Sequence, residues 1–267
     1  MERPLAGETV VVTGAARGLG ASAALALAAA GARCILLDRL GRRLGDVADR
    51  AEERSAIPAV PLVGDLADPG DARRSVGWAR EAAGGDLAAF VHCAGVLERE
   101  RVERTGNTAW NRMLAVNLTA AFLFVRALLP ALRSGRGGSI VLTSSRAGVE
   151  GFAREAAYCA SKFGIEGLAQ AVAAETAGEA VVANTITPGA RIKPTGLSLK
   201  KEARLPAAER TWGSSEALGA AFVALAALAL RPDEAPSGRR FRADRVAAAV
   251  EQHGAPLPPE AWEGLAE

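Results

Sequence analysis

Short apolar runs alternate with longer amphipathic or Ala-rich segments along most of the chain. The runs are mostly apolar on consecutive positions, as in strands covered on both faces. They predict strands over Thr9–Thr13, Arg33–Leu37, Ala59–Val63, Leu87–His92, Ser139–Thr143 and Val181–Thr187, with a weak last strand near Arg239–Arg242. The segments between them predict helices over Ala21–Ala30, Leu44–Arg54, Asp71–Ala83, Ala109–Arg133, Glu155–Ala177 and Ala217–Leu230.

This order of elements predicts the α/β class. Strands that alternate with helices are joined by right-handed crossovers into a parallel sheet. We therefore expect a Rossmann-type doubly wound sheet with helices on both faces, formed by residues 1–267 as a single domain. Two segments depart from the pattern. The polar stretch 190–215 lacks periodicity and is expected to be a substrate lid, and the Pro-rich tail from about 255 is expected to pack loosely.

Composition excludes several classes of function. The chain carries 32 basic and 30 acidic residues, a net charge of +2 that gives no reason to expect nucleic acid or a membrane as partner. Three cysteines without a CxxC spacing and two histidines argue against a disulfide framework and against a metal site. The first residues lack a secretory pattern, and the longest apolar run, Ala217–Leu230, is too short to span a bilayer. We expect a cytoplasmic protein.

The first predicted strand runs into a glycine-rich turn, Thr13-Gly14-Ala15-Ala16-Arg17-Gly18-Leu19-Gly20. Glycines let a pyrophosphate approach the backbone, and the N-terminus of the next helix attracts its charge. The second strand ends near Asp38, about 20 residues further on, where a carboxylate can accept both ribose hydroxyls of NAD. Arg17 and Arg39 oppose this reading, because a guanidinium can pair with the 2′-phosphate of NADP. The balance favours NAD(H), with NADP(H) possible.

The only tyrosine, Tyr158, precedes Lys162 by four residues on a predicted helix, which places both on one face. An ammonium group there lowers the pKa of a phenol, so that it can exchange a proton with an alcohol or carbonyl oxygen. This spacing of tyrosine and lysine is common by chance, so it indicates a catalytic site only together with the other motifs of the chain.

With the TGxxxGxG spacing of the turn, the chain resembles the classical short-chain dehydrogenase/reductase family over residues 5–245. The resemblance implies a catalytic tetrad of Asn117, Ser145, Tyr158 and Lys162, with Ser145 preferred over Ser144 because it lies 13 residues before the tyrosine. The Asn117 carbonyl would hold a water of the proton relay. It also implies cofactor contacts, which would come from Gly14, Arg17, Gly18, Leu19, Gly20, Asp38, Arg39, Asp65, Leu66, Ala94, Gly95, Tyr158, Lys162, Pro188, Gly189 and Ile192.

The chain departs from the family pattern at two places. His92-Cys93-Ala94-Gly95 stands where the family has Asn-Asn-Ala-Gly, and we interpret Cys93 as a packed thiol and His92 as a structural histidine. After Pro188-Gly189 the usual hydrophobic residue comes one position late, as Ile192. The substrate pocket is expected after Gly95, after Ser145 and after Gly189.

The resemblance implies an oxidoreductase that moves a hydride between a nicotinamide cofactor and a carbonyl or secondary alcohol, as ketoreductases and alcohol dehydrogenases do. The alternative is a non-catalytic NAD(P)-binding regulatory or scaffold protein on the same fold. The resemblance further implies a homotetramer or homodimer, formed through the helices over Ala109–Arg133 and Glu155–Ala177. Basic residues of the 190–215 stretch suggest an anionic or polar substrate.

Overall fold

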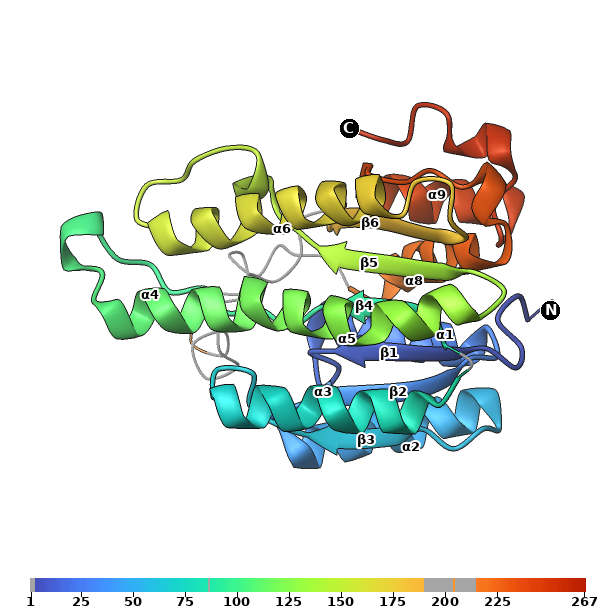
Figure 1. Ribbon diagram of the computed structural model, residues 1–267, viewed down its shortest axis with the longest axis horizontal. Helices are drawn as coiled ribbons and strands as arrows, with labels where there is room; N and C mark the ends of the chain where they lie inside the picture. The colour runs from blue at the N-terminus through green and yellow to red at the C-terminus, as the bar shows by residue number, and fades with distance from the viewer. Residues whose placement is uncertain (1–2, 86, 190–203, 205–214) are drawn as a thin grey trace.

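The computed structural model describes residues 3–85, 87–189, 204 and 215–267. Seven parallel strands form one sheet in the order β3-β2-β1-β4-β5-β6-β7 (Figure 1). Their bounds are β1 Thr9–Thr13, β2 Arg33–Asp38, β3 Val60–Val63, β4 Leu87–His92, β5 Gly138–Thr143, β6 Val181–Thr187 and β7 Arg240–Arg242. The predicted Rossmann-type doubly wound fold is confirmed, and the weak last strand is β7.

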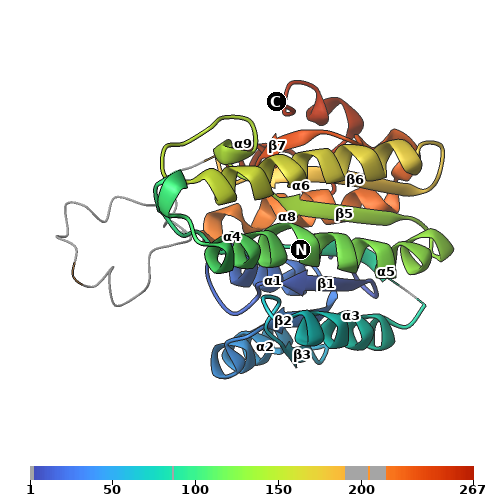
Figure 2. The ribbon, with the colours of Figure 1, turned by 60° about the vertical axis from the view of Figure 1, so that its left-hand side comes forward.

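Helices cover both faces of the sheet, as Figures 1 and 2 show from two sides. One layer holds α1 Gly18–Ala29, α2 Gly41–Ser55, α8 Gly219–Ala226 and α9 Ala243–His253; the other holds α3 Pro69–Ala83, α4 Asn107–Leu114, α5 Ala120–Ser134 and α6 Ala156–Glu175. Alternate residues of a strand enter the two cores: Val10 and Val12 pack in one, and Val11 packs in the other. Both faces are therefore apolar, which explains the continuous apolar runs.

The helix expected over 109–133 begins at Asn107 and is interrupted by one π-helical turn, Ala115–Thr119, between α4 and α5. By length and composition this stretch, Asn107–Ser134, is the one helix among the described residues that is apolar enough to cross a membrane. Its inner face carries buried Phe124 and Leu128 against the sheet. Core packing accounts for part of the apolar composition, because 44% of its most apolar window is buried, while Trp110 and Phe122 are exposed.

The C-terminal tail is not loosely packed, so that expectation is wrong. Trp262 is buried edge-on against Phe241 of β7, with ring centroids 5.1 Å apart. Ala266 forms an antiparallel bridge with Phe241, and the Glu267 carboxylate pairs with Arg240. The prolines made the segment irregular without making it loose, because Leu257 and Trp262 have apolar surface to bury. Helix α9 was also absent from the sequence prediction.

The chain order places the site. Strands β1, β2 and β3 run outward in one direction, and the chain then returns to place β4 on the other side of β1. The loops after β1 and β4 therefore diverge at the carboxyl edge of the sheet and leave a crevice, which is where ligands bind in folds of this kind.

Candidate active site

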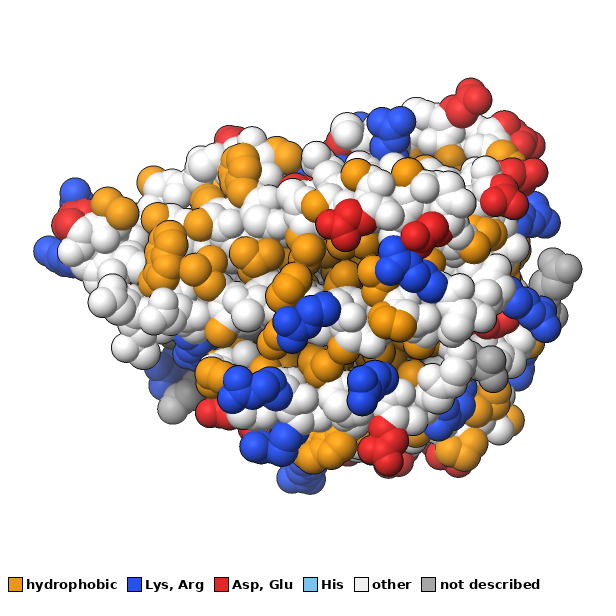
Figure 3. Space-filling view, in the orientation of Figure 1, with side chains coloured by type: hydrophobic (Ala, Val, Ile, Leu, Met, Phe, Trp, Pro, Cys, Tyr) orange, Lys and Arg blue, Asp and Glu red, His pale blue; other side chains and the backbone are white. Residues whose placement is uncertain are grey.

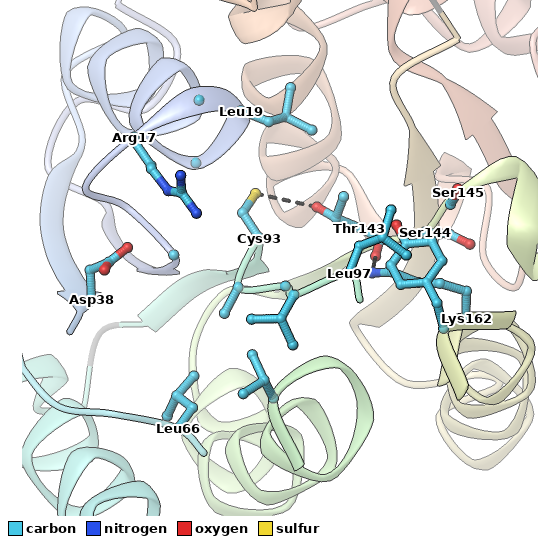
Figure 4. A pocket seen from close by; sticks show the side chains of 18 of the residues that line it. Arg17, Leu19, Asp38, Leu66, Cys93, Leu97, Thr143, Ser144, Ser145 and Lys162 are labelled. Carbon is cyan, nitrogen blue, oxygen red and sulfur yellow. Dashed lines mark hydrogen bonds between the residues drawn. The ribbon is translucent and has the colours of Figure 1, made fainter. Parts of the chain in front are cut away.

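A cleft of about 700 Å³ opens at this carboxyl edge. Figure 4 shows Arg17, Leu19 and Asp38 on one side of it, Ser144, Ser145 and Lys162 on the other, and Cys93 and Thr143 between them. The cleft brings together most residues predicted from the sequence: Gly14, Arg17, Gly18, Leu19, Gly20, Asp38, Arg39, Asp65, Leu66, Ala94, Gly95, Ser145, Tyr158, Lys162 and Pro188. Asn117 and Gly189 do not line it, and Ile192 lies outside the described residues.

Two glycines of the turn, Gly14 and Gly20, lie too close to neighbouring backbone atoms for a side chain, whereas Gly18 has open space around it. Gly14 has a φ of +70°, and a Cβ there would lie 2.5 Å from the backbone nitrogen of Ala94. A Cβ on Gly20 would collide with the Gly14 carbonyl. Helix α1 begins at Gly18, and its first N–H groups have no side-chain cap among the described residues. The turn thus has the open backbone and the helix N-terminus that bind a pyrophosphate.

Asp38 ends β2 beside this turn and holds two backbone groups. Its Oδ2 accepts a hydrogen bond from Ala16 N at 3.1 Å, and its Oδ1 accepts one from Leu40 N at 3.0 Å. Each carboxylate oxygen keeps acceptor capacity for a ribose hydroxyl. Three guanidinium groups line the same part of the cleft, those of Arg17, Arg39 and Arg43. Arg43, on α2, was missed by the sequence analysis, because nothing in the order of residues distinguishes it from other surface arginines.

Lys162 reaches the floor of the cleft from α6. Its Nζ donates to the Thr143 carbonyl at 2.7 Å and lies 5.7 Å from the centroid of the Tyr158 ring. Burial lowers the pKa of Lys162 to about 8, while the nearby Cys93 and Glu166 oppose the shift. At pH 7 the ammonium form therefore predominates, one turn of helix from the Tyr158 phenol.

Two neighbouring serines follow β5, and the structure distinguishes them. Ser144 is buried, and its hydroxyl accepts a bond from Arg240 Nη1 at 3.3 Å. Ser145 is partly exposed in the cleft, and its Oγ accepts a bond from Ala147 N at 3.2 Å, which leaves the hydroxyl proton available. This geometry favours Ser145 as the serine that faces a substrate.

Asn117 lies in the π-helical turn and is fully buried. Its side chain pairs with the backbone of Val96 in both directions, at 2.8 and 3.0 Å, and also donates to Ser161 Oγ at 3.0 Å. The amide therefore ties the loop after Gly95 to α6. It acts from behind the cleft wall, which is why it does not line the cavity.

His92 and Cys93 replace the usual amides with other cross-strand links. His92 Nδ1 is 2.8 Å from Thr13 Oγ1 on β1, and Cys93 Sγ is 3.2 Å from Thr143 Oγ1 on β5 (Figure 4). Burial, helped by the Lys162 charge, lowers the pKa of His92 to about 3, although the backbone carbonyls of Val116 and Asn117 oppose the shift. Burial raises the pKa of Cys93 to about 11. Both groups are neutral at pH 7, which agrees with structural roles.

The substrate end of the cleft is formed by the segments expected after Gly95 and Ser145, together with the start of α6. Its side chains are partly apolar, from Val96, Leu97, Ala147 and Phe152, and partly charged. The charged ones are Arg99, Arg112, Arg146 and Glu155. The three arginines pair with Glu155 and with two carboxylates outside the lining, as Arg99–Glu155, Arg112–Glu98 and Arg146–Glu150, which we call the rim pairs. These residues were not singled out from the sequence, because only the chain's return to one edge brings them together. The stretch after Gly189 lies outside the described residues.

The family model described as short chain dehydrogenase matches residues 8–203. A trans-4-hydroxycyclohexanecarboxylate dehydrogenase from Sinomonas cyclohexanicum is 36% identical over 203 residues, covering 74% of this chain and 77% of that protein. A short chain dehydrogenase from Pseudomonas syringae superposes with a TM-score of 0.79 at 30% identity, covering 91% of this chain and 97% of that one. A Shigella flexneri short chain dehydrogenase complexed with NADP gives 0.78 at 27% identity, covering 91% and 99%.

The fold and the cleft define a dinucleotide-binding oxidoreductase. The chain belongs to the short-chain dehydrogenase family, which confirms the resemblance noted in its sequence. It is an NAD(P)-dependent enzyme that moves a hydride between a nicotinamide and a carbonyl or alcohol carbon. The family match supports this function over that of a non-catalytic binding protein.

Proposed function

We propose that Tyr158 is the acid and base of this dehydrogenase, with Ser145, Lys162 and Asn117 as its partners. The observation that carries the proposal is the meeting of Tyr158, Lys162 and Ser145 in the cleft that also holds the glycine-rich turn. The bound nicotinamide would supply or accept the hydride. Tyr158 exchanges the proton with the reacting oxygen, and the Ser145 hydroxyl donates a hydrogen bond to that oxygen. The Lys162 ammonium stabilises the phenolate, and the Asn117 backbone carbonyl would hold a water molecule of the proton relay.

The cofactor would lie along the cleft from the turn to Tyr158. Gly14, Gly18 and Gly20 would admit the pyrophosphate, with Leu19 beside it. Asp65 and Leu66 would flank the adenine, and Ala94, Gly95, Pro188 and Gly189 would pass close to the remainder. The fit of this part of the cleft is supported by the close backbone packing that glycine permits at Gly14 and Gly20, and by the start of helix α1 at Gly18 without a side-chain cap from Arg17. These roles assume that the whole chain, 1–267, works as one domain.

Replacing Tyr158 with Phe tests the acid–base assignment, because it removes the proton donor and little volume. We expect kcat to fall by about 10²- to 10⁴-fold, while NADH binding, measured by fluorescence titration, changes little. The substrate panel should include trans-4-hydroxycyclohexanecarboxylate, neutral cyclic secondary alcohols and the matching ketones, because one relative is named for the first of these. A variant that kept more than about a tenth of the wild-type rate would refute the assignment.

We further propose that NAD(H) is preferred over NADP(H). The Asp38 carboxylate would accept the ribose hydroxyls and repel a 2′-phosphate, and one such carboxylate contributes about 10- to 100-fold, or 1.4–2.8 kcal/mol. Arg17, Arg39 and Arg43 act in the opposite direction. Dissociation constants for NADH and NADPH decide the matter, since tighter NADPH binding would contradict the proposal. In the variant Asp38→Ala, the preference for NADH should disappear.

We propose that two or four copies associate through α4, α5 and α6 and that the protein works in the cytoplasm, without a membrane or nucleic-acid partner. Trp110, Phe122 and Phe163 are 37%, 44% and 49% exposed on these helices, and Figure 3 shows hydrophobic side chains spread over this face. A C₂ interface needs such a self-complementary surface. Light scattering at micromolar concentration should give a dimer or tetramer, and the variant F122D/F163D should give a monomer. A monomeric wild type would refute the association.

A further inference from the structure

Arg240 forms a buried hub directly behind the two serines. It lies at the start of β7, about 10% of its side chain is exposed, and its guanidinium donates in four directions. Nε bonds Glu267 at 2.9 Å and Nη2 bonds the Ser145 carbonyl at 3.1 Å. Nη1 bonds Glu166 and, at 3.3 Å, the Ser144 hydroxyl. A buried guanidinium with this many partners holds them in one geometry.

The partner carboxylate connects this hub to the catalytic helix. Glu166 lies on α6, four residues after Lys162 and eight after Tyr158. Its second oxygen accepts a bond from Thr185 Oγ1 on β6 at 2.7 Å, so the carboxylate is held from both sides. The Arg240–Glu166 pair therefore links the Ser145 segment to the helix that presents the acid–base tyrosine.

The turn after Ser145 packs directly against the Arg240–Glu166 pair. The Ser145 carbonyl accepts a second bond from Gly148 N at 2.9 Å. A Cβ on Gly148 would lie 2.6 Å from Ser144 Oγ and 3.1 Å from Glu166 Oε1, so only glycine permits the close approach. The Ser145 carbonyl is thus held by Arg240 and by Gly148 N, and Glu166 holds Arg240 in place.

We propose that Arg240, with Glu166 as its counterion, is a positioning residue that keeps the Ser145 hydroxyl in register with Tyr158. The inference rests on the proposed function, because it acts through Ser145. The Ser145 hydroxyl and the Tyr158 phenol must reach the same substrate oxygen, and a displacement of about 1 Å at such a site costs up to about 100-fold in rate. A lysine cannot replace Arg240, because a single ammonium lacks the planar fork that reaches Glu166 and the Ser145 carbonyl together.

The test is a mutant cycle between this pair and Ser145. The pair deletion R240M/E166L removes both charges, so that neither is left buried and unpaired. We measure kcat on the best substrate of the panel above, the NADH dissociation constant and the melting temperature for R240M/E166L, S145A and the triple variant. The matched control is R133M/E179L, which deletes the exposed, doubly bonded Arg133–Glu179 pair away from the cleft.

If Arg240 acts through Ser145, R240M/E166L lowers kcat by about tenfold or more, leaves NADH binding within about threefold, and has less than about a threefold effect once Ser145 is alanine. The control pair leaves kcat unchanged. Losses that multiply in the S145A background, or that accompany an equal loss of NADH binding, would overturn the proposal. If R240M/E166L does not fold, R240K is carried through the same cycle with the same criteria. A lack of effect of S145A alone would instead refute the proposed function.

Discussion

The polar groups at the floor of the cleft and those at its rim contrast in burial and in expected effect. Cys93, Thr143 and Lys162 form the floor, and fully buried His92 and Thr13 lie beneath it; we call this whole group the floor, and its members are linked at 2.7–3.2 Å. The rim pairs join longer side chains at 2.6–3.1 Å, and five of their six members are about 40% exposed or more. Water screens the rim but not the floor, so similar distances have different energetic consequences.

The comparison indicates that burial, through its effect on ionisation, distinguishes the polar groups of the floor from those of the rim more than hydrogen-bond length does. Burial moves the pKa of His92 to about 3, of Cys93 to about 11 and of Lys162 to about 8. The floor therefore holds neutral side chains around one ammonium group, which keeps the positive charge next to Tyr158. The rim pairs place side chains of both signs mostly in water, so we expect them to affect the approach of a substrate more than the stability of the fold.

Among the groups of the floor, His92 should contribute most to the loss of protein stability at acid pH. Its folded-state pKa lies below the unfolded value of 6.5, so the unfolded chain binds more protons and stability is lost as the pH falls from 6.5 to about 3. The loss amounts to about 4–5 kcal/mol at the low end. His92→Gln should flatten this part of the dependence on pH, measured by urea unfolding at several pH values.

The second histidine provides the control. His253 is exposed at the end of α9, and His253→Gln should leave the slope between pH 6.5 and 3 as in the wild type. If both variants keep the wild-type slope, the acid lability of the fold does not come from His92.

Lys162→Met should stabilise the protein at neutral pH while it abolishes turnover. The unfolded lysine titrates near 10.5 and the folded one near 8, so burial of the charge costs about 3 kcal/mol below pH 8. The lost bond to the Thr143 carbonyl offsets about 1 kcal/mol of the gain. The net gain of about 2 kcal/mol should shrink as the pH rises from 8 to 10.5, because the wild-type lysine becomes neutral.

Unfolding curves for Lys162→Met at pH 7, 9 and 10.5 measure this trend, with Arg133→Met as an exposed cation whose effect should not vary over the same window. A Lys162→Met variant less stable than the wild type at pH 7 would contradict the assigned cost of burial.

Deleting a rim pair should have the smallest effect on stability. Deleting the pair Arg112–Glu98, 3.0 Å apart and 43% exposed on both sides, should change the free energy of unfolding by less than about 1 kcal/mol. Its effect should appear in KM, with a severalfold difference between carboxylated and neutral substrates that weakens at high salt. Equal KM changes for carboxylated and neutral substrates would contradict a role of the rim pairs in substrate selection.

Much of the site could be predicted because it depends on local order. The turn from Thr13 to Gly20 lies between a strand and a helix, and Tyr158 and Lys162 are one helical turn apart, so spacing alone places them. Ser145 and Asn117 followed from resemblance, and the structure adds why they differ: Ser145 faces the cleft, whereas Asn117 is buried in a π-helical turn that the sequence pattern did not reveal.

The strands, the glycine-rich turn and the Tyr158–Lys162 pair can be predicted from the order of residues, because each depends on periodicity or on neighbours a few residues apart. Three contacts depend instead on the folded chain: His92 bonds Thr13, Arg240 reaches Ser145 across 95 positions of chain, and the tail packs on β7. Contacts of this kind depend on which strands become neighbours and on what burial leaves unsatisfied. An isolated arginine, histidine or tryptophan carries no local sign of the partner that the fold will bring to it.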